Sequence, residues 1–228
     1  MLKYIPIILP FAYAMWMYYV SARRTAGILS QRSKPLADPE LTALLIRFAD
    51  ILDQPHVQVY VFDDPSVNGL ASPDGRVFLT EGFMEKYRQG AVSASELASV
   101  VAHELGHVAM GHTKRRMVDM TGQNALAMLL ASLLSRFIPG IGPAIAQSLT
   151  TALAAGFSRK DEYEADAYAS ALMVKSGLGL GPQKSLFAKL EHLTGHSGAD
   201  IPAWLRSHPH THERIKAIET RESQWLQD

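Results

Sequence analysis

Two histidines and a glutamate near the middle of the chain have the spacing of a catalytic metal site. The stretch His103-Glu104-Leu105-Gly106-His107 places both imidazoles on one face of a helix, one turn apart. Neutral imidazoles in that geometry supply two of the three protein ligands that a catalytic zinc ion requires. Glu104 lies beside them, where its carboxylate can take a proton from a metal-activated water molecule. The stretch predicts one zinc ion per chain, with His103 and His107 as ligands and Glu104 as general base.

The residues around this motif are typical of an amphipathic helix. Ser93 followed by Glu96 is the pattern of a capping box, and Gly111 is a plausible end of the helix. Between them, apolar residues recur at helical spacing at Leu97, Val100, Val101, Leu105 and Val108. The alternative is a core helix whose histidines match the motif by chance, so the rest of the chain must decide.

Composition favours a chain with one well-formed core and excludes several kinds of site. The chain has 228 residues, of which 47% are hydrophobic, and 22 Lys+Arg balance 22 Asp+Glu. Balanced charge gives no indication of nucleic-acid binding, which normally requires a basic face. The chain contains no cysteine, which excludes disulfides, thiolate zinc ligands and a cysteine nucleophile.

The start of the chain predicts a transmembrane helix. Tyr4 to Ala22 contain no charged residue, and a run of that length can span a bilayer as a helix. A cleaved signal peptide is the alternative, because Lys3 precedes the run and Ala12-Tyr13-Ala14 resembles a cleavage site. Apolar residues continue past that site, which favours an uncleaved, single-pass anchor in contact with membrane lipid. We therefore expect an anchor over residues 1–24 and a linker over 25–37. Basic residues after the run favour a cytoplasmic position for the rest of the chain.

Residues 38–228 predict one α+β domain that is mainly helical. Asp38-Pro39-Glu40 starts a first helix, and short strands are expected at 57–62, 67–71 and 76–80, followed by a helix over 81–88. The strands predict a small antiparallel sheet. Its edge, at Asn68, Gly69, Leu70 and Ala71, can accept an extended peptide substrate through main-chain hydrogen bonds. A purely structural meander is the alternative.

A second apolar region covers residues 124–157 and predicts a helical hairpin. Its two halves are too short to span a bilayer singly, and Pro139 to Pro143 provide the turn between them. The hairpin is expected to be part of the core or a lid over the site, with an element that dips into the membrane as the alternative.

Two acidic residues downstream complete the predicted metal site. The next helix is expected to begin at Ser158, and Glu162 and Asp166 share one face of it. Glu162 supplies the third ligand, because catalytic zinc sites commonly use two histidines and a glutamate. Asp166, one turn on, can accept the free ring N–H of a ligand histidine. A solvated acidic first turn is the alternative.

Four segments, in this order, resemble the HtpX-like membrane zinc metallopeptidases. That family includes bacterial HtpX, the BepA- and LoiP-type periplasmic proteases, the mitochondrial stress protease of the inner membrane, and the prenyl-protein endopeptidases. The matching segments are Asn68-Gly-Leu-Ala with Gly75 to Gly82, the His103 to His107 motif, Ser158-Arg159-x-x-Glu162-x-x-Ala165-Asp166, and Ser207-His208-Pro209-His210-Thr211 with Arg214-Ile215.

The resemblance implies a zincin-like fold and a gluzincin endopeptidase that acts on misfolded or membrane proteins, in protein quality control at the bacterial inner membrane. It implies zinc ligation by His103, His107 and Glu162, with Glu104 as general base. Asp166 resembles the family's acidic residue that supports a ligand without binding the metal itself. His208 resembles a catalytic-site histidine that approaches the metal, either blocking it or steadying the transition state.

This chain also differs from the members of the family that it resembles. HtpX proper has more membrane spans and the BepA type adds helical repeats, whereas only one anchor is visible here. A latent or weakly active zinc protein that acts as a holdase or assembly factor is therefore the alternative function, with the 124–157 hairpin covering the cleft.

Four further histidines are interpreted as ordinary surface or loop residues: His56, His112, His192 and His196.

Overall fold

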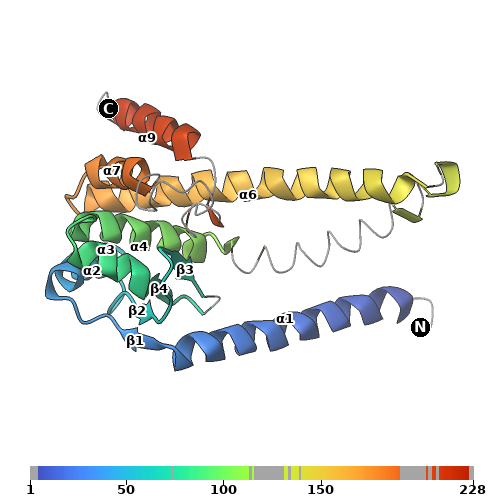
Figure 1. Cartoon of the computed structure of the whole chain (residues 1–228), viewed down its shortest axis with the longest axis horizontal. Coiled ribbons are helices and arrows are strands. Elements are labelled where there is room, and N and C mark those ends of the chain that lie inside the picture. Colours follow the sequence, from blue (N-terminus) through green and yellow to red (C-terminus); the bar gives the residue numbers. More distant parts are fainter. Residues whose placement is uncertain are drawn as a thin grey trace.

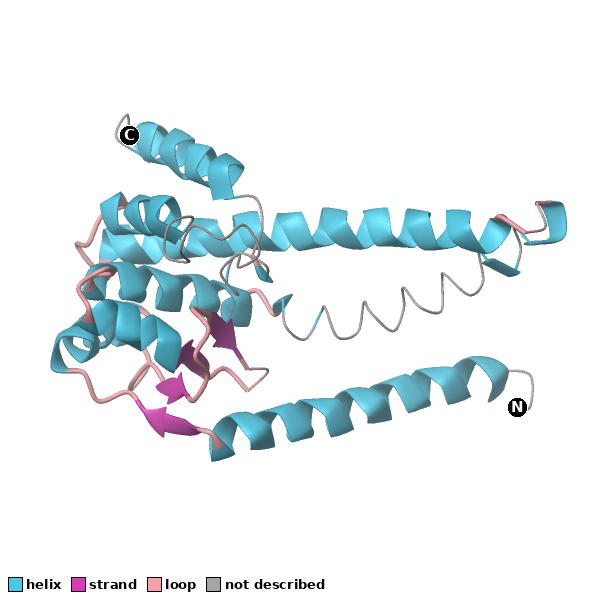
Figure 2. Cartoon of the chain, in the orientation of Figure 1, coloured by secondary structure: helices cyan, strands magenta, loops and turns pink. Residues whose placement is uncertain are grey.

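Helices surround one small sheet in this protein (Figure 1). The computed structural model describes residues 5–72, 74–112, 115, 131–132, 135–138, 140–190, 204, 207–208 and 211–225. The helices are α1 (Ile5–Gln31), α2 (Pro39–Ile51), α3 (Glu81–Arg88), α4 (Ala94–Ala109), α6 (Gly142–Lys175), α7 (Gly181–Leu190) and α9 (Thr211–Trp225). The strands are β1 (Ser33–Pro35), β2 (Val59–Phe62), β3 (Gly69–Ala71) and β4 (Val77–Thr80). The prediction of a mainly helical α+β domain is confirmed (Figure 2).

The sheet is mixed, so the prediction of an antiparallel sheet was wrong. Its strand order is β1-β2-β4-β3. Strand β2 pairs with β4 in parallel, whereas β1–β2 and β3–β4 are antiparallel. All four residues of β4 are buried, and a continuous apolar strand favours the centre of a sheet over its edge. β4 therefore takes the central position, and the shorter β3 forms an edge.

Strand β1 lies at the opposite edge of the sheet. The range 25–37, suggested as a linker, contains the end of α1 and this strand. Lys34 is paired with Val61, and Pro35 with Tyr60. Proline is tolerated here because an edge strand leaves half of its backbone groups outside the ladder.

Helix α4, which carries the His-Glu-His motif, lies at the centre of the domain. Figure 1 shows the sheet and α2 on one side of it and α6 with α7 on the other. Ser93 caps it as predicted: its side chain accepts a hydrogen bond from the Glu96 N–H, and the Glu96 carboxylate accepts one from the Ser93 N–H. Leu97, Val100 and Val101 are fully buried in the core. The capped, doubly covered helix is a rigid support for the motif.

Helix α6 is continuous from Gly142 to Lys175, so the prediction that a separate helix begins at Ser158 was wrong. Gly156 and Ser158 separate the apolar stretch from the acidic stretch, but a single glycine inside a helix costs only about 1 kcal/mol, and the helix continues through both residues. Of the predicted 124–157 hairpin, residues 124–130 lie outside the described part of the chain, and 142–157 form the first half of α6.

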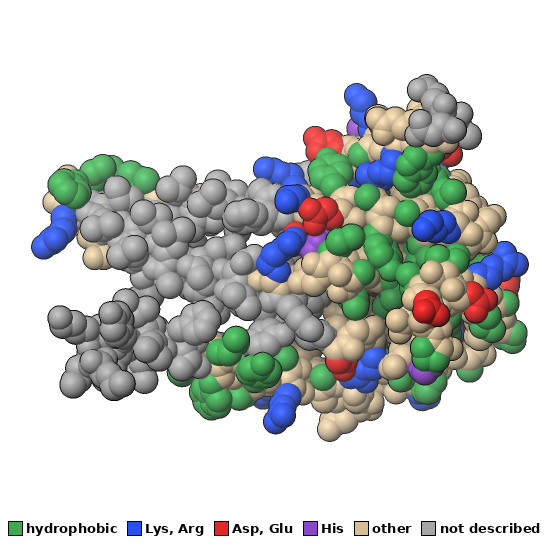
Figure 3. All heavy atoms as spheres, turned by 180° about the vertical axis from the view of Figure 1, so that it is seen from behind, with side chains coloured by type: hydrophobic (Ala, Val, Ile, Leu, Met, Phe, Trp, Pro, Cys, Tyr) green, Lys and Arg blue, Asp and Glu red, His purple; other side chains and the backbone are tan. Residues whose placement is uncertain are grey.

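The first half of α6 and helix α1 both extend away from the domain towards the same side (Figure 1). Large apolar side chains are exposed near the end of the α6 extension, where Phe137 is 81% and Ile141 58% exposed. Figure 3 shows this apolar group from behind. Helix α1 exposes Tyr13, Trp16 and Tyr19.

The predicted transmembrane helix is not confirmed. Residues 5–31 do form one helix, but within the described residues no helix combines the length and the apolar character needed to cross a membrane. Tyrosine, tryptophan and proline make up much of the uncharged run, which is less apolar than an aliphatic run of equal length.

Candidate metal centre

The structure brings the predicted metal ligands together in a buried cluster. His103 and His107 come from α4, and Glu162 from α6. The Nε2 atoms of the two histidines are 3.1 Å apart, and Glu162 lies 3.3 Å from His103 Nε2 and 3.6 Å from His107 Nε2. Each of the three residues is at most 3% exposed. The helical spacing of the motif and the packing of α4 on α6 together produce this convergence.

Asp166 and Arg214 hold His103 from behind. His103 Nδ1 lies 3.0 Å from Asp166 Oδ1, and the Arg214 guanidinium donates two hydrogen bonds to the same carboxylate, at 2.6 and 2.7 Å. Both Asp166 and Arg214 are buried. Burial alone raises the pKa of Asp166, but Arg214 outweighs it and lowers the pKa to about 2. The carboxylate is therefore ionised and fixes which nitrogen of His103 points at the cluster.

The charge around His103 favours a bound cation. Burial alone lowers the pKa of His103, but hydrogen bonds to Asp166 and Glu162 outweigh it and raise the pKa to about 9. Burial alone raises the pKa of Glu162, whereas His103 and His208 lower it well below its usual range. The centre therefore contains ionised carboxylates that stabilise positive charge, whether a proton or a metal ion.

His112 lies behind His107, although the sequence suggested an ordinary surface or loop residue. It is 0% exposed, and the Nδ1 atoms of His107 and His112 are 2.8 Å apart. The other ring nitrogen of His112 is 3.0 Å from Glu164 Oε2. The interpretation of His112 as a surface or loop residue was therefore wrong. The position of His112 five residues after His107, just past the end of α4, was the available signal.

Glu104 faces the same cluster as the ligands. It is 2% exposed, and its Oε1 atom has no hydrogen-bond partner within the described part of the chain. The His208 imidazole lies beside it, with Nε2 3.4 Å from that oxygen. A buried carboxylate oxygen without a partner is costly unless a ligand or water completes it, which suits a general base.

His208 joins the cluster from the C-terminal part of the chain. Its Nδ1 atom is 2.7 Å from Glu162 Oε2 and 3.3 Å from His103 Nε2. Arg214 donates a hydrogen bond to the His208 carbonyl, and the buried Trp204 ring packs 4.9 Å from the imidazole. The backbone N–H of Trp204 donates to Val67 O. This segment therefore covers the centre from the side of β3.

The predicted substrate residues lie along the edge next to Glu104. Among the described residues β3 pairs only with β4, and its other edge has no strand partner there. Gly69 packs so closely on α4 that a Cβ atom there would lie 2.6 Å from Val100 Cγ1 and 3.8 Å from Glu104. The Asn68 side-chain oxygen is buried without a hydrogen-bond partner among the described residues. Leu70 and Ala71 follow on the same strand.

The donor set fits a zinc ion. The side chains of His103, His107, Glu162 and His208 each place one ligand atom within 4.8 Å of the others, all of them buried. The Nδ1 atoms of His103 and His107 are engaged by Asp166 and His112, so both Nε2 atoms face inward. Imidazole and carboxylate donors in a cysteine-free site are typical of catalytic zinc.

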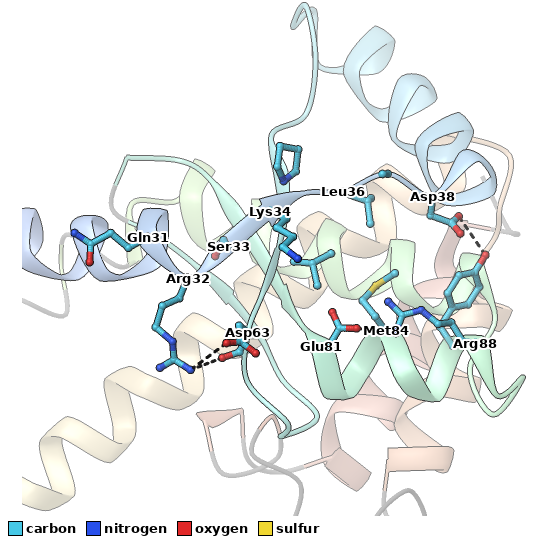
Figure 4. Close-up of a pocket in the computed structure, with 14 residues that line it drawn as sticks. Gln31, Arg32, Ser33, Lys34, Leu36, Asp38, Asp63, Glu81, Met84 and Arg88 are labelled. Carbon is cyan, nitrogen blue, oxygen red and sulfur yellow. Dashed lines mark hydrogen bonds and ion pairs between the residues drawn. The ribbon is translucent and has the colours of Figure 1, made fainter.

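A large pocket lies away from this cluster. It has a volume of about 670 Å³ and is lined by residues of β1, α3 and the turn after β2, as Figure 4 shows. Two ion pairs lie along it, Arg32 with Asp63 and Arg88 with Glu81. None of the clustered histidines lines it, so it is not part of the metal centre.

Comparison with known proteins agrees with this geometry. The sequence profile of peptidase family M48 matches residues 35–222, a range that contains every residue of the cluster. The chain is 27% identical over 175 residues to the mitochondrial metalloendopeptidase OMA1 of Schizosaccharomyces pombe, covering 74% of this chain and 46% of that protein.

Two bacterial relatives are similar at a comparable level. The metalloprotease LoiP of Escherichia coli is 32% identical over 174 residues, covering 73% of this chain and 62% of LoiP. A protease HtpX homolog of Acidiphilium cryptum is 31% identical over 173 residues, covering 68% of this chain and 58% of that protein. The chain thus spans about half the length of these relatives.

Proposed function

The chain belongs to peptidase family M48, and we propose that it is a zinc-dependent endopeptidase that hydrolyses peptide bonds in misfolded or membrane proteins. The observation that carries this proposal is the buried Glu104 carboxylate beside three converging ligand side chains. Relatives named as metalloproteases and metalloendopeptidases support it. Cleavage of misfolded proteins makes this a protein of quality control.

The residues divide the chemistry between them. Zinc held by His103, His107 and Glu162 would polarise the scissile carbonyl and acidify a water molecule. Glu104 takes the proton from that water and passes it to the leaving amine. Its Oε1 atom makes no hydrogen bond within the described residues, so it can accept the proton without breaking one.

The substrate binds as an extended strand along β3. The outer edge of β3, which has no strand partner in the described part of the chain, supplies backbone donors and acceptors whatever the substrate sequence, and Asn68 lies at its start. Binding through main-chain hydrogen bonds suits an enzyme whose substrates are recognised by being unfolded. Folded proteins would not present an extended segment of this kind.

Ligand substitutions test the assignment of the metal. Glu162→Gln or His103→Ala should lose bound zinc when metal content is measured on the purified protein. Glu85→Gln and His212→Ala, both at exposed positions, are matched controls that should keep zinc. Full occupancy in either site variant would remove that residue from the ligand set.

A latent enzyme, or a holdase with a zinc site, is the second candidate. The position of His208 favours it, because Nδ1 lies within 3.3 Å of both Glu162 and His103 and can close the position that substrate needs. A His208→Ala variant should then cleave an unfolded protein faster than wild type. Slower cleavage by that variant would instead indicate that His208 supports the transition state.

We further propose that the two projecting segments contact lipid. The exposed apolar side chains of Phe137 and Ile141 near the end of the α6 extension, and of Trp16 on α1, support this, since isolated domains rarely expose such groups together. Phe137→Ser/Ile141→Ser should reduce co-flotation with phosphatidylcholine vesicles. The control Ile46→Ser, at an exposed residue of α2, should not. Equal flotation of both variants would contradict lipid contact through this end.

A further inference from the structure

One buried histidine beside the metal centre contributes no ligand atom to it. His112 follows α4 and is completely buried. One ring nitrogen faces His107 at 2.8 Å and the other faces Glu164 at 3.0 Å. Both nitrogens are therefore within hydrogen-bond distance of a named partner, and the imidazole connects the ligand helix α4 to α6.

We propose that His112 is the positioning residue for the metal ligand His107. This rests on the proposed function, because it takes His107 as a zinc ligand. If Nε2 of His107 binds the metal, the ring hydrogen lies on Nδ1 and is donated to Nδ1 of His112. His112 then carries its own hydrogen on Nε2 and donates it to the Glu164 carboxylate. One chain of donors and acceptors fixes the ring orientation and the tautomer of both histidines.

The two ligand histidines are thus held in different ways. Behind His103 stands a carboxylate, Asp166, in direct contact. Behind His107 stands another imidazole, His112, and the Glu164 carboxylate is one residue further away. His107 is therefore oriented without adding a further carboxylate in direct contact with it, beside a centre that already contains the buried Asp166 and Glu162.

A cation, Arg115, holds the far end of this series of hydrogen bonds in place. Arg115 contacts the Asp161 carboxylate and lies 3.7 Å from Glu164. Asp161 is also within 3.8 Å of His112 Nε2. Arg115 thus keeps both carboxylates in place beside His112. It also links the segment that follows α4 to α6, so the geometry of His107 depends on how these two parts of the chain are joined.

A second metal site is the competing use of the same residues. His112, Asp161 and Glu164 place ligand atoms within 4.8 Å of one another. However, the Arg115 guanidinium already pairs with both carboxylates, and one nitrogen of His112 is directed at His107. The structure therefore favours a positioning role, and metal stoichiometry distinguishes the two: one zinc per chain for positioning, two for a second site.

The test measures zinc affinity of the full chain by competition with a chromogenic chelator. His112→Phe removes both hydrogen bonds and should weaken zinc binding by about tenfold or more, as substitutions behind metal ligands do. His112→Asn, whose side-chain oxygen can accept from His107, should recover part of that loss. His56→Phe, at an exposed histidine, is the matched control and should bind zinc like wild type.

Two further measurements separate positioning from general damage. The visible spectrum of the cobalt(II)-loaded protein should change in His112→Phe, because the ligand geometry changes, and revert towards wild type in His112→Asn. If His112→Phe does not fold, Glu164→Ala is the variant that tests the proposal. Glu164 is about one third exposed, and its replacement should also weaken zinc binding, by a smaller factor than His112→Phe would.

The proposal would be overturned if folded His112→Phe kept both the zinc affinity and the cobalt spectrum of wild type. If His112→Phe does not fold, unchanged zinc affinity in Glu164→Ala would overturn it instead. A stoichiometry of two zinc ions in wild type, falling to one in His112→Phe, would also overturn it. Failure of the proposed function looks different, since wild type itself would then bind no zinc or would cleave no protein while binding it.

Discussion

Gly106 of α4 lies directly against the backbone of Ala165 on α6. A Cβ atom on Gly106 would lie 2.9 Å from both the Cα and the carbonyl oxygen of Ala165, closer than such atoms approach in proteins. Because His103 and His107 lie on one helix and Glu162 on the other, this contact sets the distance between the two halves of the metal centre.

Gly106→Ala should therefore weaken both the fold and the metal site. The methyl group must push backbone away, which costs about 1–3 kcal/mol for overpacking of a core, and zinc affinity should fall with it. Thermal unfolding of the metal-free protein and chelator competition measure the two effects. Gly27→Ala, where nothing lies within 4 Å of the new methyl group, is the control and should not destabilise α1. Wild-type zinc affinity in Gly106→Ala would contradict this account of the helix contact.

Gly69→Ala should reduce cleavage but spare zinc binding. Its methyl group would meet Val100 Cγ1 at 2.6 Å, so β3 must move away from α4, while the ligands on α4 and α6 stay in place. The expected result is a lower kcat/KM with unchanged zinc content. The double variant Gly69→Ala/Val100→Ala removes the clash and should recover activity relative to Gly69→Ala. Unaltered kcat/KM in the single variant would show that β3 is not the substrate strand.

Asp166→Asn should destabilise the protein strongly. It leaves the buried Arg214 without its ionised partner, and breaking a buried ion pair in this way costs about 3–5 kcal/mol. Denaturant unfolding measures the loss. Asp63→Asn removes an exposed carboxylate that pairs with Arg32 on the surface and should change stability by less than about 1 kcal/mol. Similar values for the two variants would mean that the Asp166–Arg214 pair does not act as a buried pair.

Zinc affinity should rise with pH up to about pH 9. The pKa of His103 in the metal-free protein is raised to about 9 from its ordinary value of 6.5, so zinc must displace a proton from this ligand below pH 9. By linkage, the proton on His103 stabilises the metal-free fold fully below pH 6.5, and that contribution is lost as pH rises through 9. Chelator competition from pH 6.5 to 9 tests the first point. Affinity that is flat across this range would contradict it.

The elements that carry the site could be predicted because their signals are local. Ser93 and Glu96 mark the start of α4, and the spacing of His103 and His107 defines one helix face. Glu162 and Asp166 share a face of α6 for the same reason. Each inference needs only residues within about one or two helical turns, which the sequence displays directly.

The features that the sequence did not predict depend on contacts between distant residues. The central position of β4 follows from its burial between β2 and β3, and three short strands alone do not specify their order. His112 contacts Glu164, 52 residues further on, through the packing of α4 on α6. The prediction of a separate helix from Ser158 was wrong because a serine followed by acidic residues resembles a helix start but can also occur inside a longer helix.

The most direct test of the central claim compares wild type with Glu104→Gln on an unfolded model protein, with zinc content measured in both. Glutamine retains the size of the side chain but cannot take the proton. We expect equal zinc content and a loss of cleavage by several orders of magnitude in Glu104→Gln. Cleavage at the wild-type rate by a zinc-loaded Glu104→Gln would contradict the assignment of Glu104 as general base and, with it, the proposed mechanism.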